Sequence, residues 1–193
     1  MAGVKIVQRC SWAQSNTLMQ AYHDDEWCKP SYDERYIFEM LSLEGAQAGL
    51  SWQLILNKRS AYQTAFQNFD IEYCANLTPA ELEHICISFP IVKNRNKIRS
   101  VQTNALAVQL LQKQYGSFAD FLWAYVDYKP IDTKRPTANL PASTPLSEQI
   151  SKDLKKCGFK FVGPIIIYSF LQAIGLVNDH ESQCFCRLQQ ETF

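Results

Sequence analysis

Cys10-Ser11-Trp12 and Ala21-Tyr22-His23-Asp24-Asp25-Glu26-Trp27 place a thiol and an imidazole, both among aromatic residues, near the start of the chain. A second such pair, His180 and Cys184, lies near its end. Thiolate and imidazole are ligands that suit zinc, and four of them complete a tetrahedral structural site. If Cys10, His23, His180 and Cys184 share one ion, the two ends of the chain are held together and the residues between them fold as one unit.

Spacing alone leaves this metal site open to another interpretation. His180 and Cys184 are four residues apart, so on a helix they would lie one turn apart on the same face. Cys186 is a rival for the fourth ligand position, although it is poorly placed to share that face. Alternatively, the cysteines are buried as small hydrophobic residues and the histidines are satisfied core residues.

Length and composition limit the class of protein. The chain has 193 residues, and we expect one domain over 1–193. Its seven cysteines lack regular spacing and its N-terminus lacks the apolar segment of a signal peptide, so a cytoplasmic location with reduced or metal-bound thiols is expected. The most apolar run, Val162 to Val177, is too short to cross a membrane, and no membrane partner is expected.

The charge of the chain argues against one kind of partner. The formal net charge is zero, which disfavours strong nonspecific binding to nucleic acid but allows local basic faces. Short charge runs are more often solvated helix faces than binding sites. Nothing indicates a coiled coil, so a monomer is the default expectation. The two basic clusters are Lys93, Arg95, Lys97 and Arg99, and Lys152, Lys155, Lys156 and Lys160.

Hydrophobic periodicity close to 3.6 residues predicts helices through most of the chain, and we find no alternating strand pattern. Thr78-Pro79-Ala80-Glu81 is a capping box with proline at the first helical position, which is a specific helix start. The expected helices are Asp33–Leu50, Ser60–Phe69, one from Thr78, Arg95–Tyr115, Phe118–Val126, Thr144–Lys156, and one from Val162 or Gly163 to Gly175. The predicted fold class is therefore all-α.

The segment from Lys129 to Pro145 differs from the rest of the chain. It contains four of the eight prolines and few large apolar residues. It is expected to be a long loop, and loops of this length are usually functional or mobile.

Glu44 lies inside an apolar helical stretch, where burial without a partner would be costly. Four aromatic residues, Trp12, Tyr22, Trp27 and Trp52, flank this acid and the first two candidate ligands. Aromatic faces with one carboxylate suit a flat, electron-poor or cationic ring, which they hold by stacking, cation–π attraction and hydrogen bonds. The alternative is a tryptophan-rich core with a solvated glutamate.

Longer motifs connect these residues to a known family. The chain resembles the bacterial DNA-3-methyladenine glycosylase I family, of the helix-hairpin-helix superfamily, from about Cys10 to Cys184. The motifs that carry the resemblance are Cys10-Ser11-Trp12, Tyr22-His23-Asp24-Asp25-Glu26-Trp27, Phe38-Glu39-Met40-Leu41, Leu43-Glu44-Gly45-Ala46-Gln47-Ala48-Gly49-Leu50-Ser51-Trp52, Gly158-Phe159-Lys160-Phe161-Val162-Gly163, Tyr168-Ser169-Phe170-Leu171-Gln172-Ala173 and Gly175-Leu176-Val177-Asn178-Asp179-His180.

The resemblance implies a helix-hairpin-helix glycosylase-type bundle in which a structural Zn²⁺ joins the N- and C-terminal regions. Its ligands would be Cys10, His23, His180 and Cys184. The resemblance also implies a base pocket formed by Glu44, Tyr22, Trp52, Trp12 and Trp27.

The resemblance further implies contacts with double-stranded DNA. The hairpin maps onto Ile91 to Ile98, where backbone amides and the cations Lys93, Arg95 and Lys97 would grip phosphates. Gly49 and Leu50 would form part of a wedge at the gap left by the flipped base. The family usually has a glycine before the hairpin, where this chain has Phe89-Pro90, and Met19 and Cys28 also depart from residues common in relatives.

The implied activity is hydrolysis of the N-glycosidic bond of 3-methyladenine in alkylated DNA, which releases the base for base-excision repair. Glu44 and Tyr22 would hydrogen-bond the flipped base, and Trp52 would stack on it. No lysine lies within the pocket motifs, so a monofunctional enzyme without a Schiff-base step is expected. Two alternatives stay open, which are a glycosylase for another damaged base and a lesion-binding module that does not cut.

Overall fold

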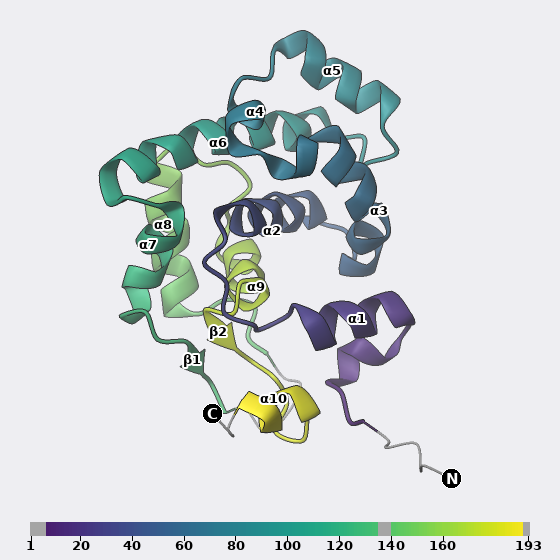
Figure 1. Ribbon diagram of the computed structural model, residues 1–193, viewed down its shortest axis with the longest axis vertical. Coiled ribbons are helices and arrows are strands. Elements are labelled where there is room, and N and C mark those ends of the chain that lie inside the picture. Colours follow the sequence, from purple (N-terminus) through teal and green to yellow (C-terminus); the bar gives the residue numbers. More distant parts are fainter. Residues whose placement is uncertain (1–6, 135–139, 191–193) are drawn as a thin grey trace.

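A computed structural model describes residues 7–134 and 140–190 of the chain, and helices make up most of it (Figure 1). The α-helices are α1 (Thr17–Asp25), α2 (Glu34–Gln47), α3 (Trp52–Ala65), α4 (Ile71–Ala75), α5 (Pro79–Ser88), α6 (Arg95–Tyr115), α7 (Phe118–Trp123), α8 (Pro145–Lys156), α9 (Pro164–Ala173) and α10 (Phe185–Gln190). Three short 3₁₀ helices are η1 (Ser11–Gln14), η2 (Gln67–Phe69) and η3 (Ala124–Val126). None of these described helices is long and apolar enough to span a bilayer.

Local capping chemistry fixes where many of the helices begin. The predicted capping box at Thr78 is confirmed, since the Thr78 side chain accepts from the Glu81 amide and Glu81 reaches back to the Thr78 amide. Thr144 forms a similar box with Ser147 at the start of α8. Ser51 caps α3 by accepting from the Leu54 amide. These side chains satisfy amides that the first turn of a helix cannot pair internally.

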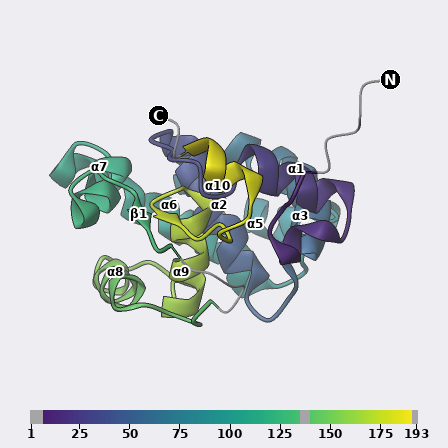
Figure 2. The same cartoon turned by 90° about the horizontal axis from the view of Figure 1, so that it is seen from below.

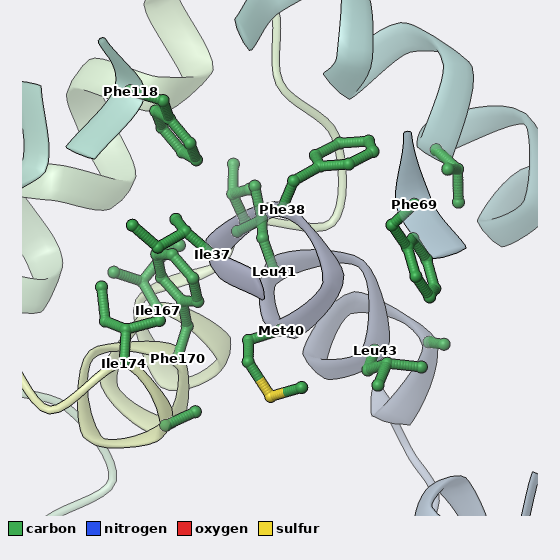
Figure 3. Packing of buried hydrophobic residues seen from close by; sticks show 14 of the residues in the cluster. Ile37, Phe38, Met40, Leu41, Leu43, Phe69, Phe118, Ile167, Phe170 and Ile174 are labelled. Atoms are coloured by element: carbon green, nitrogen blue, oxygen red, sulfur yellow. The ribbon is translucent and has the colours of Figure 1, made fainter. Parts of the chain in front are cut away.

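The core forms around α2 and α9. Every residue of α2 from Ile37 to Ala46 is buried. Figure 3 shows Ile37 of α2 beside Ile167, Phe170 and Ile174, with Phe69 and Phe118 farther out. Gly45 allows close packing, because a Cβ there would lie 3.3 Å from Phe161 Cβ. Burial of the acid Glu44 therefore follows from its place on a helix that is enclosed on all sides.

Both ends of the described chain lie at one end of the molecule, where α1 and α10 are neighbours (Figures 1 and 2). The Phe185 amide donates to the Gln8 carbonyl at 2.9 Å. A short parallel pair of strands, β1 (Ile131–Asp132) and β2 (Val177–Asn178), adds a second connection. The predicted proximity of the two terminal regions is thus confirmed.

Several predicted boundaries shift in the structure. The helix predicted over Asp33–Leu50 is α2, which ends at Gln47 rather than Leu50. The next helix, α3, begins at Trp52, well before the predicted start at Ser60. It ends at Ala65, because Gln67, Asn68 and Phe69 have positive φ values of 47°, 54° and 56°. The all-α prediction holds for the described chain except for β1 and β2, which are two residues each and too short for an alternating pattern. Of the predicted loop at 129–145, residues 135–139 lie outside the described part.

Candidate active site

A cavity of about 370 Å³ opens between α1, the C-terminal half of α2, the start of α3 and the segment that follows α9. It brings together all five residues predicted to bind a base, which lie far apart in the sequence. The residues that line it are Cys10, Ser11, Trp12, Met19, Tyr22, Trp27, Glu44, Gln47, Trp52, Leu140, Ser169, Gln172, Asp179 and Glu181.

Glu44 supplies a carboxyl group from the wall formed by α2. Its side chain is buried, and burial raises the pKa of this carboxyl to about 8. Among the described residues, only four buried side-chain polar atoms lack a hydrogen-bond partner, and Glu44 Oε2 and Trp52 Nε1 are two of them. Buried polar atoms are normally paired. Two unpaired atoms in one cavity indicate that the cavity receives a polar ligand.

Aromatic rings form much of the remaining wall. The rings of Tyr22 and Trp52 are tilted by 55° with centroids 5.2 Å apart. Trp12 meets Trp27 edge to face at 4.9 Å and lies 6.3 Å from Tyr22. Burial, with a smaller contribution from nearby Glu44, raises the pKa of Tyr22 well above its usual value, so its hydroxyl stays protonated and can donate. These walls suit a flat ring with hydrogen-bonding edges.

Asp179 is a second buried acid at the cavity wall, and sequence reasoning missed it. It accepts hydrogen bonds from the Tyr168 hydroxyl, the Gln172 amide at 2.7 Å and the Thr133 hydroxyl. The sequence showed Asp179 only as the neighbour of His180. Its partners come from the residue after β1 and from α9, and nothing in the sequence brings these together. Unlike Glu44, Asp179 is anchored within the protein.

The four predicted metal ligands meet at the edge of this cavity. Cys10 Sγ and Cys184 Sγ each lie 3.5 Å from His180 Nδ1, and Cys184 Sγ lies 3.4 Å from His23 Nε2. All four ligand atoms are buried and lie within 4.8 Å of one another. Tetrahedral zinc with usual bond lengths would place sulfur and nitrogen ligands about 3.6 Å apart. The observed spacing therefore fits a tetrahedral ion.

Neighbouring groups orient these ligands for a metal. Asp24 Oδ1 lies 2.8 Å from His23 Nδ1, and Arg9 holds the same carboxylate through two nitrogens, which leaves His23 Nε2 directed at the thiols. Hydrogen bonds from Cys10, Cys186 and the two imidazoles hold the pKa of Cys184 well below its usual value. This favours the thiolate, which is the form that binds metal.

His180 and Cys184 do not lie on a helix, so they are not brought together by the one-turn helical spacing that their separation in the sequence would allow. Both residues lie in the turn before α10, and α10 begins at Phe185. Cys186 lies on α10 and its Sγ is 3.9 Å from His23 Nδ1, the nitrogen that faces away from the other thiols. Cys186 is therefore close to the cluster, where it also neighbours Cys184, but it lies nearest the other nitrogen of the His23 imidazole.

Trp27 connects the cluster with the cavity. Its ring stacks on His23 at 5.9 Å and meets His180 edge to face at 4.8 Å, while it also lines the cavity. Cys10 borders both as well. The cluster is therefore placed to hold one wall of the cavity.

The predicted DNA contacts lie around two turns. Gly49 and the exposed Leu50 form the turn between α2 and α3, next to Trp52. Lys93 donates to the carbonyls of Cys86, Ile87 and Phe89 at the end of α5. The turn before α6 forms without a positive φ at Phe89 or Pro90, so it does not require the family's usual glycine.

The other two predicted cations also have partners within the protein. Exposed Arg95 pairs with Glu83, and half-buried Lys97 donates to the carbonyls of Ala46 and Ala48 at 2.8 and 2.6 Å. Burial lowers the pKa of Lys97. A phosphate would have to compete with these partners, and contacts between these cations and DNA stay a prediction.

Comparisons with known proteins agree on one family. The sequence model described as Methyladenine glycosylase matches residues 12–187. DNA-3-methyladenine glycosylase 1 of Escherichia coli K12 is 42% identical over 181 residues, which cover 93% of this chain and 97% of that protein. A crystal structure of 3-methyladenine DNA glycosylase I superimposes with a TM-score of 0.89 at 46% identity and covers 93% of this chain and 99% of that one.

A third similar protein is the Staphylococcus aureus 3-methyladenine DNA glycosylase I, whose structure concerns recognition of 3-methyladenine. Its TM-score is 0.88 at 37% identity, over 92% of this chain and 95% of that one.

Proposed function

The chain belongs to the methyladenine glycosylase family and excises 3-methyladenine from alkylated DNA, and we propose that the cavity around Glu44 performs this reaction. One observation carries the assignment of the site. The cavity combines a buried carboxyl group that lacks a partner with aromatic walls, and this combination matches a flat, positively charged base.

Access to the cavity requires that the base leave the DNA stack. Extrusion of a base costs a few kcal/mol and costs least for a damaged base. In the proposed complex Trp52 stacks on the flipped base, and Trp12 and Trp27 close the cavity. Glu44 and Tyr22 hydrogen-bond its edge, and the unpaired Trp52 Nε1 offers a further donor.

The chemistry of the base determines what the enzyme must supply. Methylation at N3 makes adenine cationic in DNA, so the base is already a good leaving group. As the N-glycosidic bond breaks, its electron pair leaves with the base, and a water molecule adds to the sugar carbon and loses a proton. Glu44 is the proposed catalytic residue. A cationic base bound beside it opposes the effect of burial and lowers the pKa of its carboxyl, and the resulting carboxylate favours the positive charge that passes to the sugar as the bond breaks.

The proposed reaction ends with an abasic strand that stays intact. No lysine lines the described cavity, so an amine that would form a Schiff base with the sugar is not among its lining residues. This supports monofunctional hydrolysis.

Zinc in this proposal is structural. Cys10, His23, His180 and Cys184 would supply all four ligands, and a site with four protein ligands leaves no position for a reactive water. When bound, the ion would join the two terminal regions and fix the wall that contains Trp27.

Double-stranded DNA is the proposed substrate form. Leu50 is exposed at a turn beside the cavity, where it can fill the gap left by the flipped base. Lys93, Arg95 and Lys97 lie at the start of α6 and the turn before it. Of these, Lys93 and Arg95 are proposed to face the phosphates, whereas the Lys97 ammonium donates to carbonyls of α2. The free cysteines of the described chain support a reducing, cytoplasmic setting, and a monomer is proposed.

A titration with free 3-methyladenine tests the role of Glu44. We expect Glu44→Gln to weaken binding by at least about tenfold, because the amide replaces one acceptor oxygen by an NH₂ donor at the edge where the base presents its own N–H groups. Glu181→Gln is the matched control, since Glu181 also lines the cavity but is already bonded to Ser11. Equal affinity of the wild type and Glu44→Gln would remove Glu44 from base recognition.

A further inference from the structure

Lys97 has an unusual position for a cation that was expected to face DNA. The Asn94 side chain, which caps α6, accepts from the Lys97 backbone amide at 3.1 Å. The Lys97 ammonium reaches across to α2, where it donates to the carbonyls of Ala46 and Ala48. Lys97 thus joins the start of α6 to the end of α2, at a place where α2 has no basic residue in its own last turn.

The carbonyls that Lys97 binds surround a specific turn. Ala48 has φ and ψ of −42° and 114°, Gly49 has φ of 76°, and the Leu50 amide donates to the Gln47 carbonyl at 2.6 Å. This is a type II turn, which requires a positive φ at its third residue and therefore favours glycine. Types I and II differ in which way the peptide between the two central residues points. The Ala48 carbonyl belongs to this central peptide, so the hydrogen bond that it accepts from Lys97 favours one of the two orientations.

The turn determines the positions of two residues in the proposed reaction. Leu50 is its last residue, and Trp52 is the first residue of α3, two positions later. A cation near the last carbonyls of a helix also offsets the negative end of the helix dipole. Lys97 therefore contributes both a hydrogen-bond lock on the turn and a favourable charge at the end of the helix that carries Glu44.

We propose that Lys97 is a positioning residue that locks the Gln47–Leu50 turn and so holds Leu50 and Trp52 in place for base extrusion. This inference rests on the proposed function of the Glu44 cavity. It assigns Lys97 a role inside the protein, and a phosphate contact is the competing outcome of the test.

Two measurements on DNA separate these roles. If Lys97 positions the turn, Lys97→Met lowers the single-turnover rate of base release by about 10- to 100-fold, since small displacements near a reacting group have effects of this size. The salt dependence of binding to undamaged duplex stays unchanged. If Lys97 instead contacts a phosphate, the plot of the logarithm of the DNA-binding constant against the logarithm of the salt concentration becomes shallower by about one unit of slope in Lys97→Met. That result would overturn the proposal. Arg99→Met is the control, because it removes one exposed positive charge from the same helix.

Gly49→Ala supplies a second, independent variant. A Cβ at Gly49 meets no protein atom within 4 Å, so within the protein the substitution acts through the positive φ of the turn. Lys97→Met and Gly49→Ala should combine less than additively in base release, because both act on one turn. Additive effects would contradict the proposal.

Amide exchange at Leu50 tests the lock without any catalysis. We expect the exchange of this amide to accelerate by at least about tenfold in folded Lys97→Met, and to stay unchanged in Arg99→Met. Unchanged exchange in Lys97→Met would overturn the lock. A wild type that releases no 3-methyladenine would refute the proposed function instead, and the exchange result would still decide the role of Lys97.

Discussion

The carboxyl group of Glu44 links the cavity to the stability of the fold. Burial raises its pKa to about 8, whereas its ordinary value is 4.5. Below the ordinary value the group is protonated in both states and has no effect. As the pH rises from there to about 8, the unfolded chain ionises while the folded protein does not, so the folded state loses stability.

We therefore predict that Glu44→Gln increases stability at alkaline pH. The free energy of unfolding of the wild type should fall as the pH rises toward about 8, by on the order of a few kcal/mol, and Glu44→Gln should lack this fall. Denaturant unfolding over a pH series measures the difference. A wild type and variant with parallel pH profiles would show that the Glu44 carboxyl is not held in its neutral form.

Residue types alone identified the aromatic walls and Glu44, because an acid among apolar and aromatic residues is visible in a sequence. They did not identify Asp179, since its partners Thr133 and Tyr168 come from separate segments. The prediction that Lys97 faces DNA rests on its charge, and the carbonyls that it binds in the structure have no signal in the sequence.

At the scale of elements, the connection between α1 and α2 packs against the end of α9. The amides of Cys28 and Ser31 donate to the carbonyls of Gln172 and Ile174. Gly175 ends this region with φ of 71°, and a Cβ there would lie 2.1 Å from the backbone carbon of Lys29. The close approach positions α9 against the segment that contains Trp27.

We predict that Gly175→Ala destabilises the protein by about 3 kcal/mol or more, because backbone strain adds to a clash with backbone atoms that cannot move aside. Gly49→Ala is the matched comparison. It has a similar φ but open space around the Cβ, so it should cost only about 1 kcal/mol. Thermal and denaturant unfolding measure both, and equal losses would mean that the packing at Lys29 is unimportant.

The sequence predicted elements well where capping chemistry is local, as at Thr78 and Thr144. It failed at the start of α3, because the prediction left residues 52–59 outside any helix and did not recognise Ser51 as a helix cap. It failed again after Ala65, because the positive φ values at Gln67 to Phe69 have no signal in residue type. The β1–β2 pair depends on tertiary contact alone.

At the scale of the whole molecule, the Cys and His cluster connects the two terminal regions. Cys10 and His23 come from the start of the chain, and His180 and Cys184 from its end. The Gln8–Phe185 hydrogen bond reinforces the same connection, and the Arg9 guanidinium lies 5.8 Å from the centroid of the Phe185 ring. Metal bound here would therefore act on global stability more than on chemistry.

We predict that Cys184→Ser lowers both the zinc content and the free energy of unfolding. Cys186→Ser is the matched control, because its thiol is not among the four ligand atoms that converge and it lies nearest the other nitrogen of His23, so zinc content should stay unchanged. Metal analysis and unfolding on the same samples measure this. A Cys184→Ser protein with full zinc content and stability that has lost only base release would contradict a structural role for the metal.

The most direct test of the account is base release from methylated duplex DNA by the wild type and Glu44→Gln. We expect the wild type to release 3-methyladenine in preference to 7-methylguanine and 8-oxoguanine, to leave the abasic strand uncleaved, and to lose most of this activity in Glu44→Gln. Binding of the lesion without release, preferential release of another base, or full activity in Glu44→Gln would contradict it.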